Sequence, residues 1–289
     1  MKIKVYRFYE GVKVKKYFFS LLLCGILLYS LQGRESIDRI GIQEAWFNHK
    51  AGESEFNAAH TMLYYEYETT YDNRVAHNVF VGIGSSAGNL NGIASVAGSQ
   101  SLSTAPVRGG MGLNLDANFG LGYYFITRTR DKPLYLGVGL RESLGAIAYG
   151  NMPTMVEFIG TYLPLELHGD VALNHKVRLE YLAAYDVLLA TSGAVAVYGG
   201  KNIQSHTLSF AGGQNALRFM LGLRYYVNET SFFFTQLYAK FESLGTSSSV
   251  DVSIAADSTA PGAIAGANAT IHYPKSHTSF VGLRVGFGF

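Results

Sequence analysis

Apolar and polar positions alternate along most of the chain, and the clearest case is 112–125. One face of this segment carries Leu113, Leu115, Ala117, Phe119, Leu121, Tyr123 and Phe125, and the other carries Asn114, Asp116, Asn118, Gly120 and Gly122. Side chains of a β-strand point alternately to the two faces of its sheet. The segment is therefore a strand between an apolar and a polar environment. Segments 176–189 and 216–227 repeat the pattern, with charged residues on the polar face.

The same period predicts ten strands. They span 39–47, 60–69, 75–84, 112–125, 134–143, 155–167, 176–189, 216–227, 231–243 and 280–289. The weakest is 39–47, and eight strands remain an alternative if it and one other segment fail. In 155–167, Phe158 and Leu165 can share a face only if a bulge lies between them, for which Gly160 is a candidate.

The connections alternate in length. The long ones are 48–59, 85–111, 144–154, 190–215 and 244–277, and the short ones are 70–74, 126–133, 168–175 and 228–230. Transmembrane β-barrels have long outer loops and short periplasmic turns. The fold class we predict is all-β, a transmembrane antiparallel up-and-down β-barrel of about ten strands with both ends of the chain on the periplasmic side. The loops 85–111 and 245–270 are rich in Gly, Ala, Ser and Thr, and we expect them to be mobile.

Aromatic residues support this orientation. The strand ends on the predicted periplasmic side hold Tyr67, Tyr71, Tyr123, Phe125, Tyr135, Tyr225, Tyr226, Phe232, Phe234, Phe287 and Phe289. Amphipathic rings favour the headgroup level of a bilayer, so we expect these side chains to form a girdle there. A soluble β-sandwich, the alternative fold, explains neither the girdle nor the alternation of loop lengths.

The last strand, 280–289, places Val281, Leu283, Val285, Phe287 and Phe289 on one face. This segment resembles the terminal strand of bacterial outer-membrane β-barrels of the small opacity or porin-like type. The resemblance implies that the strand ending at Phe289 is read by the barrel-assembly machinery, and that the protein lies in the bacterial cell outer membrane. It implies surface-exposed loops and no particular activity.

The N-terminal segment has the form of a signal peptide. Lys13, Lys15 and Lys16 precede an apolar run over 17–29, and Gly33 is a plausible cleavage site. The run is shorter than the roughly 20 residues of a spanning helix. We predict a signal peptide at 1–33 and a barrel domain at 34–289, with an uncleaved anchor as the alternative. Cys24, the only cysteine, lies in the apolar run. Leu23 stands where a lipoprotein signal has a small residue, so we expect Cys24 to be removed with the signal.

Charge limits the partners of the mature chain. Residues 1–33 hold six of the 23 basic residues and one of the 21 acidic ones, which leaves 17 basic and 20 acidic residues, a net charge of −3. No basic patch for nucleic acid remains. The histidines are scattered, and no set of three ligands suggests a metal site. We therefore predict no catalytic, cofactor-binding or metal-binding residues and no cofactor.

The polar face of the strands carries charges of both signs: Glu66, Glu68, Asp116, Arg141, Arg178, Glu180, Asp186, Arg218, Arg224, Lys240, Glu242 and Arg284. Charges inside a narrow barrel are stable only when they are paired and hydrogen-bonded. One interpretation is a lumen plugged by ion pairs and water. The other is a constriction selective for small solutes, although such a constriction usually has one dominant sign of charge.

A third hypothesis concerns His277 and Ser279, which share the outer face of the last strand near its outer end. Barrel closure brings that strand beside the first one, where Glu44 lies on the same face. A serine, a histidine and an acid at that level are what a lipid hydrolase needs. The His-x-Ser spacing is similar to that of lipid A deacylase barrels, but the flanking residues depart from that family's motif.

We therefore predict a monomeric surface protein that acts through its outer loops, in adhesion, envelope structure or host contact, and is not an enzyme. The first alternative is a narrow porin for small hydrophilic solutes, and the second is the lipid-modifying hydrolase. Expected partners are outer-membrane lipids, the assembly machinery and an extracellular partner of the outer loops.

Overall fold

The structure is a computed structural model that describes residues 35–91, 109–127, 131–149, 154–199, 202–211, 215–254, 256 and 263–289. The predicted signal peptide at 1–33 lies outside the described residues, as does 92–108 of the second long loop. Within the described ranges, no helix is long and apolar enough to cross a membrane.

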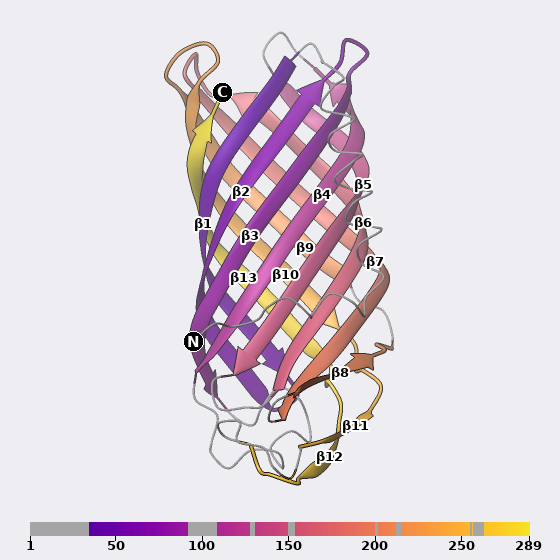
Figure 1. Ribbon diagram of the computed structural model, residues 1–289. Helices are drawn as coiled ribbons and strands as arrows, with labels where there is room; N and C mark the ends of the chain where they lie inside the picture. The colour runs from indigo at the N-terminus through magenta and orange to yellow at the C-terminus, as the bar shows by residue number, and fades with distance from the viewer. Residues whose placement is uncertain are drawn as a thin grey trace.

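Ten antiparallel strands close into a ring, which confirms the predicted fold class (Figure 1). In chain order they are β1 (Glu35–Ala51), β2 (Ser54–Thr70), β3 (Val75–Asn91), β4 (Gly110–Ile126), β5 (Lys132–Tyr149), β6 (Thr154–Ala172), β7 (Val177–Gly199), β9 (Asn215–Tyr226), β10 (Phe232–Leu244) and β13 (Ser276–Gly288). Strand β13 pairs with both β1 and β10, and this pairing closes the ring. The short strands β8 (Asn202–Leu208), β11 (Val250–Ser253) and β12 (Asn268–Ile271) lie outside it.

The register fixes the shape of the ring. A row of cross-strand partners that leaves β1 at Ser36 and passes around all ten strands returns to β1 at Asn48, twelve positions further along. Strand number and stagger together set the tilt and the diameter of a barrel. Ten strands with this stagger give strongly tilted strands, as Figure 1 shows, around an interior that side chains can fill.

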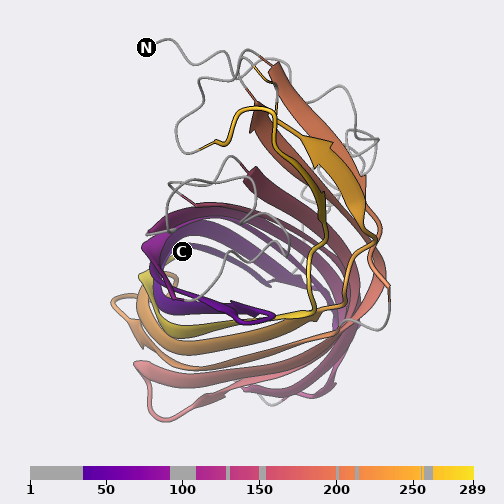
Figure 2. The same ribbon diagram turned by 90° about the horizontal axis from the view of Figure 1, so that it is seen from below.

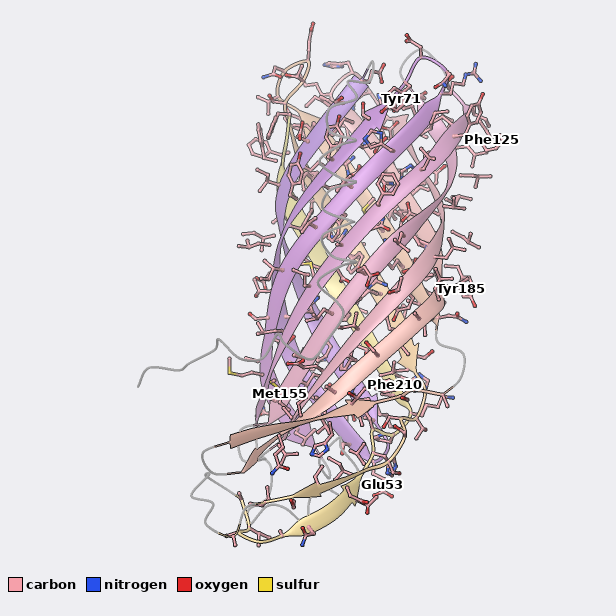
Figure 3. The ribbon with its side chains drawn as sticks, turned by 45° about the vertical axis from the view of Figure 1, so that its right-hand side comes forward. Glu53, Tyr71, Phe125, Met155, Tyr185 and Phe210 are labelled. Carbon is pink, nitrogen blue, oxygen red and sulfur yellow. The ribbon has the colours of Figure 1, made fainter. Side chains whose placement is uncertain are left out.

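The two ends of the barrel differ. The short-turn end holds the turns at 71–74, 173–176 and 227–231, the end of β4, the start of β5 and the end of β13. The other, long-loop end holds β8, β11 and β12, which stand to one side of the ring in Figure 2. Figure 3 places Tyr71 and Phe125 at the short-turn end, and Glu53 and Phe210 at the opposite end.

Several strands are longer than predicted, which changes three connections. The predicted long loop 144–154 is reduced to the four residues between β5, which ends at Tyr149, and β6, which begins at Thr154. The segment 48–59 is no long loop, because β1 and β2 continue to a tight turn at 52–53, where Gly52 has a positive φ of 59°. Residues 245–270, expected to be mobile, contain the paired strands β11 and β12. The apolar residues that lie among the Ser, Ala and Gly of this loop are buried. The overall composition of the loop had predicted a segment that buries little.

The expected bulge lies on β7 rather than at Gly160 of β6. Thr161 and Tyr162 of β6 pair with Ala190 and Leu188, so Leu189 of β7 is the extra residue. Phe158 and Leu165 lie on opposite faces: Phe158 packs in the interior, whereas Leu165 is 45% exposed. No bulge is therefore needed in β6. The extra residue on β7 directs Val195 and Val197 into a buried cluster beyond it.

An apolar belt surrounds the outside of the ring, as a membrane-spanning barrel requires. Every barrel strand contributes large exposed side chains, among them Ile42, Leu63, Ile83, Leu121, Val138, Leu165, Tyr185, Leu221, Leu237 and Leu283. Figure 3 shows Tyr185 on the outer surface about halfway along the barrel. The predicted apolar face of each strand is thus the outer face.

The predicted aromatic girdle is correct for only part of its residues. Tyr123, Phe125, Tyr225, Phe287 and Phe289 are exposed on the outside near the short-turn end, whereas Tyr135, Phe232 and Phe234 are buried. These three rings face inward because their positions alternate with outward neighbours. The Tyr135 ring covers Gly122 and Gly137, where an added Cβ would come within 2.4–2.5 Å of ring atoms. Glycine on the inner face therefore makes room for large rings in a narrow lumen.

Candidate functional site

The middle of the lumen holds a cluster of buried ion pairs centred on Arg141 of β5. The guanidinium Nη1 lies 3.0 Å from Asp186, and Nη2 lies 2.8 Å from Asp116 and 2.7 Å from Glu242. Lys240 of β10 closes the cluster, with Nζ 3.1 Å from Asp116 and 3.3 Å from Glu242. Arg141 is 2% exposed. Strands β4, β5, β7 and β10 are thereby joined across the interior.

Arg218 of β9 extends this cluster toward β6. Its Nε and Nη2 both donate to Asp186, at 2.8 and 2.9 Å, and Nη2 also donates to Glu166 at 2.9 Å. Asn78 of β3 and Asn118 of β4 donate to the same Glu166 carboxylate, at 3.3 and 3.1 Å. A carboxylate that accepts several hydrogen bonds retains its charge in a buried place at a reduced desolvation penalty.

A second tier of ion pairs lies nearer the short-turn end. Arg224 of β9 donates to Glu180 at 2.7 Å and to Asp170 at 2.8 Å. Arg178 also binds Asp170, at 2.6 Å. Arg39 of β1 lies 3.3 Å from Glu180 and 3.5 Å from Glu66. Shared carboxylates thus link β1, β2, β6, β7 and β9.

Arg284 of β13 is held differently. Its Nε donates to Gln43 at 2.8 Å, and its guanidinium lies over Tyr238, Tyr64 and Phe80, at 3.8, 5.0 and 5.1 Å from the ring centroids. A cation over an aromatic face is attracted by the ring quadrupole, more strongly where water is excluded. Three rings therefore surround this guanidinium.

The lumen as a whole is nearly balanced in charge. Its buried or half-buried cations are Arg39, Arg141, Arg178, Arg218, Arg224, Lys240 and Arg284, and its carboxylates are Glu66, Glu68, Asp116, Glu166, Asp170, Glu180, Asp186 and Glu242. A cavity of about 70 Å³ remains between the two tiers, lined by residues of both. It has room for a few water molecules.

An apolar tier separates the ion pairs from the long-loop end. Phe47, Phe56 and Phe280 are each no more than 5% exposed and pack with Ile147 and Leu90. The ring centroids of Phe47 and Phe280 are 4.8 Å apart, and those of Phe47 and Phe56 are 5.7 Å apart. The lumen therefore changes from charged to aromatic toward this end.

Beyond the ring lies a second folded region, here called the outer wing. It consists of β8, β11, β12, the end of β7 from residue 190 and the segment 272–275. Strand β8 pairs with β7, and β11 pairs with β12. The two hairpins enclose an apolar cluster of Val156, Val195, Val197, Leu208, Val252, Ile254, Ile271 and Tyr273, each at most 3% exposed.

His49 of β1 fastens the outer wing to the barrel wall. Its Nε2 hydrogen-bonds the Tyr273 hydroxyl, and its Nδ1 lies 2.8 Å from the hydroxyl of Thr278 on β13. The imidazole stacks between the rings of Phe47 and Phe158, with centroids 6.2 and 6.4 Å away. The wing is therefore attached by a buried polar contact inside an aromatic layer.

Twelve charged residues were expected on the inner face. Eleven of them contact an oppositely charged group or a hydroxyl in the lumen, and the twelfth, Arg284, packs against aromatic rings. Sequence reasoning missed Arg39, Glu166 and Asp170. Arg39 precedes Gln43 by four residues, so strand periodicity alone would have placed it on the inner face. Glu166 lies in segment 155–167, whose faces were left mixed because a bulge was expected there. Asp170 lies in 168–175, which was predicted as a short turn, whereas β6 continues to Ala172.

The proposed hydrolase triad is not assembled. His277 and Ser279 do face outward on β13, but Glu44 is the cross-strand neighbour of Leu283, four residues from Ser279. At about 3.3 Å per residue, this separation is roughly 13 Å. The Glu44 carboxylate instead accepts a hydrogen bond from the Thr61 hydroxyl, which lies 2.8 Å from Oε1 and 2.9 Å from Oε2. Elsewhere in the described ranges, no group of three or more His, Cys, Asp or Glu side chains could hold a metal ion.

Comparison with known proteins supports the fold. No family model matches the chain, and no curated protein matches its sequence. Among solved structures, it is similar to the outer membrane protease OmpT from Escherichia coli, with a TM-score of 0.56 and 11% identity over 88% of this chain and 97% of that one.

Two weaker likenesses have TM-scores below 0.5. They are the translocator domain of the autotransporter NalP from Neisseria meningitidis (TM-score 0.44, 14% identity, 95% and 97% covered) and the Pseudomonas putida toluene transporter TodX (TM-score 0.32, 10% identity, 90% and 90% covered). The chain has the fold of an outer-membrane β-barrel. At 11% identity, the likeness to OmpT shows the fold and leaves the activity open.

Proposed function

We propose that this protein is a sealed barrel of the bacterial outer membrane that acts at the cell surface through its outer wing, without enzymatic activity. The observation that carries the proposal is the contrast between a lumen filled by paired charges and rings and a folded wing outside it. A connection between two strands needs no buried core. Ordering the wing residues has an entropic cost of about 1–2 kcal/mol for each backbone residue, which the apolar cluster offsets.

The apolar belt and the turn lengths support the location and the orientation. A belt of large exposed side chains is stable only in contact with hydrocarbon, and short turns face the periplasm in barrels of this kind. The long-loop end, with the wing, is therefore expected outside the cell. Adhesion, envelope structure or host contact would each use this surface.

The ion-pair network weighs against the alternative of a narrow porin. Permeation needs a continuous polar path, whereas here opposite charges on facing walls bind each other across the lumen, and an aromatic tier follows them. The hydrolase alternative lacks its acid, because Glu44 is far from Ser279 along the strand.

Single cysteines test the display of the wing on intact cells, since the described residues contain no cysteine. Thr270→Cys lies in β12 of the wing, and Asn228→Cys lies in a short turn. A membrane-impermeant maleimide should label the first on intact cells and the second only after the envelope is opened. The reverse labelling would contradict the orientation.

Removal of the β11–β12 hairpin tests the role of the wing. A variant in which a short Gly-Ser link replaces 248–271 should still insert and show the heat-dependent gel shift of a folded barrel. Cells that carry it should adhere less to host or neighbouring cells than cells with the full chain. Equal adherence, with equal amounts of barrel at the surface, would contradict a surface role for the wing.

A further inference from the structure

On one side of the barrel, the outer face carries amides and basic residues toward the long-loop end. Successive cross-strand partners form rows around β10, β13, β1, β2 and β3. The last mainly apolar row is Ala239, Val281, Trp46, Ala59 and Ala87. The next row toward the long-loop end is Phe241, Ser279, Asn48, Asn57 and Asn89, and the one after it is Ser243, His277, Lys50 and Glu55. The row below that of Trp46 is Leu237, Leu283, Glu44, Thr61 and Ser85, and it holds the Thr61–Glu44 contact. The amides and basic residues lie only above Trp46.

The opposite wall has polar residues of another kind. The corresponding outward rows on β5, β6 and β7 are Leu144, Ile159 and Ser192, followed by Ala146, Glu157 and Ala194. These rows contain a hydroxyl and a carboxylate but no amide, lysine or histidine. The amides and basic residues therefore belong to the wall of β13, β1, β2 and β3.

The polar wall is partly organised by its own contacts. Asn48 Nδ2 donates to Glu55 at 2.5 Å and to Asn57 at 2.8 Å. Asn89, the cross-strand neighbour of Asn57, is exposed. Amides and a carboxylate held side by side on a flat sheet offer donors and acceptors for the hydroxyl groups of a sugar.

Two lysines and a histidine lie at the upper edge of the same wall. Lys50 and His277 are cross-strand neighbours, and Lys275 precedes β13. All three side chains are exposed. Neither lysine forms an ion pair with a carboxylate in the described ranges, although Glu55 is directly opposite Lys50. The two lysine charges are therefore available to an anion from outside the protein, with the His277 ring beside them.

Trp46 lies just below the polar rows and is 59% exposed. Tryptophan favours the level where hydrocarbon meets headgroups. Its position therefore places the rows Asn48–Asn57–Asn89 and His277–Lys50 at the height of lipid headgroups, and not in the hydrocarbon or far out in water.

We infer that the outer faces of β13, β1, β2 and β3 form a lateral binding site for the phosphorylated sugar headgroup of an outer-leaflet glycolipid. Lys50, Lys275 and His277 bind the phosphate, the asparagine rows bind sugar hydroxyls, and Trp46 packs against the start of the acyl chains. The inference rests on the outer-membrane location in the proposed function, and it names both the lipid chemistry and the wall that binds it.

Trp46 is the only tryptophan of the chain and reports on the site directly. Purified protein in detergent is titrated with lipopolysaccharide, with chemically dephosphorylated lipopolysaccharide and with phosphatidylglycerol. We expect a saturable change in Trp46 fluorescence with unmodified lipopolysaccharide. Dephosphorylation should weaken apparent binding by tenfold or more, and phosphatidylglycerol, which has phosphate but no saccharide, should bind weakly.

The variant Lys50→Gln/Lys275→Gln should weaken lipopolysaccharide binding about 25-fold, since one basic residue near a charged lipid surface contributes about fivefold. Lys176→Gln, an exposed lysine at the short-turn end, is the matched control and should bind like the unaltered protein. Asn89→Leu should weaken binding to lipopolysaccharide several-fold and leave the weak binding of phosphatidylglycerol unchanged. The gel shift of each variant confirms that the barrel is folded.

Equal affinity of the double lysine variant and the control would overturn the inference, as would equal binding of lipopolysaccharide and phosphatidylglycerol or no saturable change at all. These outcomes are independent of the wing. If adherence depends on the β11–β12 hairpin while the titration is negative, the surface role stands and the glycolipid site fails.

Discussion

The lumen and the outer wing both bury their side chains, but the lumen does so with ion pairs and the wing with apolar contacts. In the lumen, Arg141 is surrounded by Asp116, Asp186 and Glu242, whereas in the wing Val195 and Ile271 pack among other apolar side chains. The difference follows from what lies outside each region. The barrel wall must present its apolar face to hydrocarbon, so strand alternation sends polar residues inward. In the proposed orientation the wing lies in water, where an ordinary apolar core is stable.

The two regions should therefore fail differently when a buried side chain is removed. Loss of one partner from a buried ion pair leaves uncompensated charge, whereas loss of an apolar side chain leaves a cavity. The following substitutions test this difference between the two regions.

The largest effect is expected for Arg141→Met. It leaves three carboxylates with fewer partners and should lower the free energy of unfolding by about 3–5 kcal/mol. Urea unfolding followed by Trp46 fluorescence measures this change. Arg74→Met, in an exposed turn, is the control and should stay within about 0.5 kcal/mol of the unaltered protein. Similar values for the two variants would mean that the network contributes nothing to stability.

Ile271→Ala tests the wing in the same way. Ile271 is fully buried in the wing cluster, and truncation to Ala should destabilise the wing by about 2–5 kcal/mol. The barrel should keep its gel shift and its urea midpoint, because Ile271 lies on β12, which pairs with β11 and with no strand of the ring. Limited proteolysis should then cut 245–275 faster. A fall in the barrel midpoint equal to that of Arg141→Met would show that the two regions unfold as one.

Tyr273→Phe tests the contact between the two regions. It removes the hydroxyl that hydrogen-bonds His49 and leaves a buried imidazole nitrogen without its partner, at a penalty of about 1–3 kcal/mol. Amide hydrogen exchange should rise in β11 and β12 and change little in the ring. Unchanged exchange in the wing would mean that the apolar cluster alone holds it in place.

Ser279→Ala should have the smallest effect. Ser279 faces outward, and Glu44, the acid of the proposed triad, is paired on β1 with Leu283, four residues from Ser279, so lipid hydrolysis should not depend on Ser279. Lipid profiles of cells with the variant and with the unaltered chain should be identical. A loss of deacylated lipid in the variant alone would restore the hydrolase hypothesis.

The ten strands could be predicted because alternation of residues such as Leu113, Asp116 and Leu121 is a local signal that survives in a single sequence. The faces of β6 were left unassigned because Phe158 and Leu165 were expected to share a face, whereas Phe158 packs in the interior and Leu165 is exposed. Glu166 was therefore missed as a member of the lumen network, and Asp170 was missed because it lay in a predicted turn. Side chains that meet across the lumen come from strands far apart in sequence, and their contacts depend on the twelve-residue stagger of the ring.

The wing was harder to foresee. Val252, Ile254 and Ile271 are separated by stretches rich in Ser, Ala and Gly. The average composition of the segment therefore does not indicate that these three side chains are buried. Their partners Val195 and Val197 face the cluster only because Leu189 shifts the alternation of β7. The alternation of apolar and polar positions was enough to predict the fold, whereas the wing depends on contacts between two loops.

The central claim is that the lumen is sealed by paired charges and rings. Single-channel conductance of the refolded protein in a planar bilayer tests it most directly, with folding confirmed by the heat-dependent gel shift. The account predicts a silent membrane. Discrete, stable conductance steps that change when Arg218 or Glu180 is replaced would contradict it and would make the protein a porin.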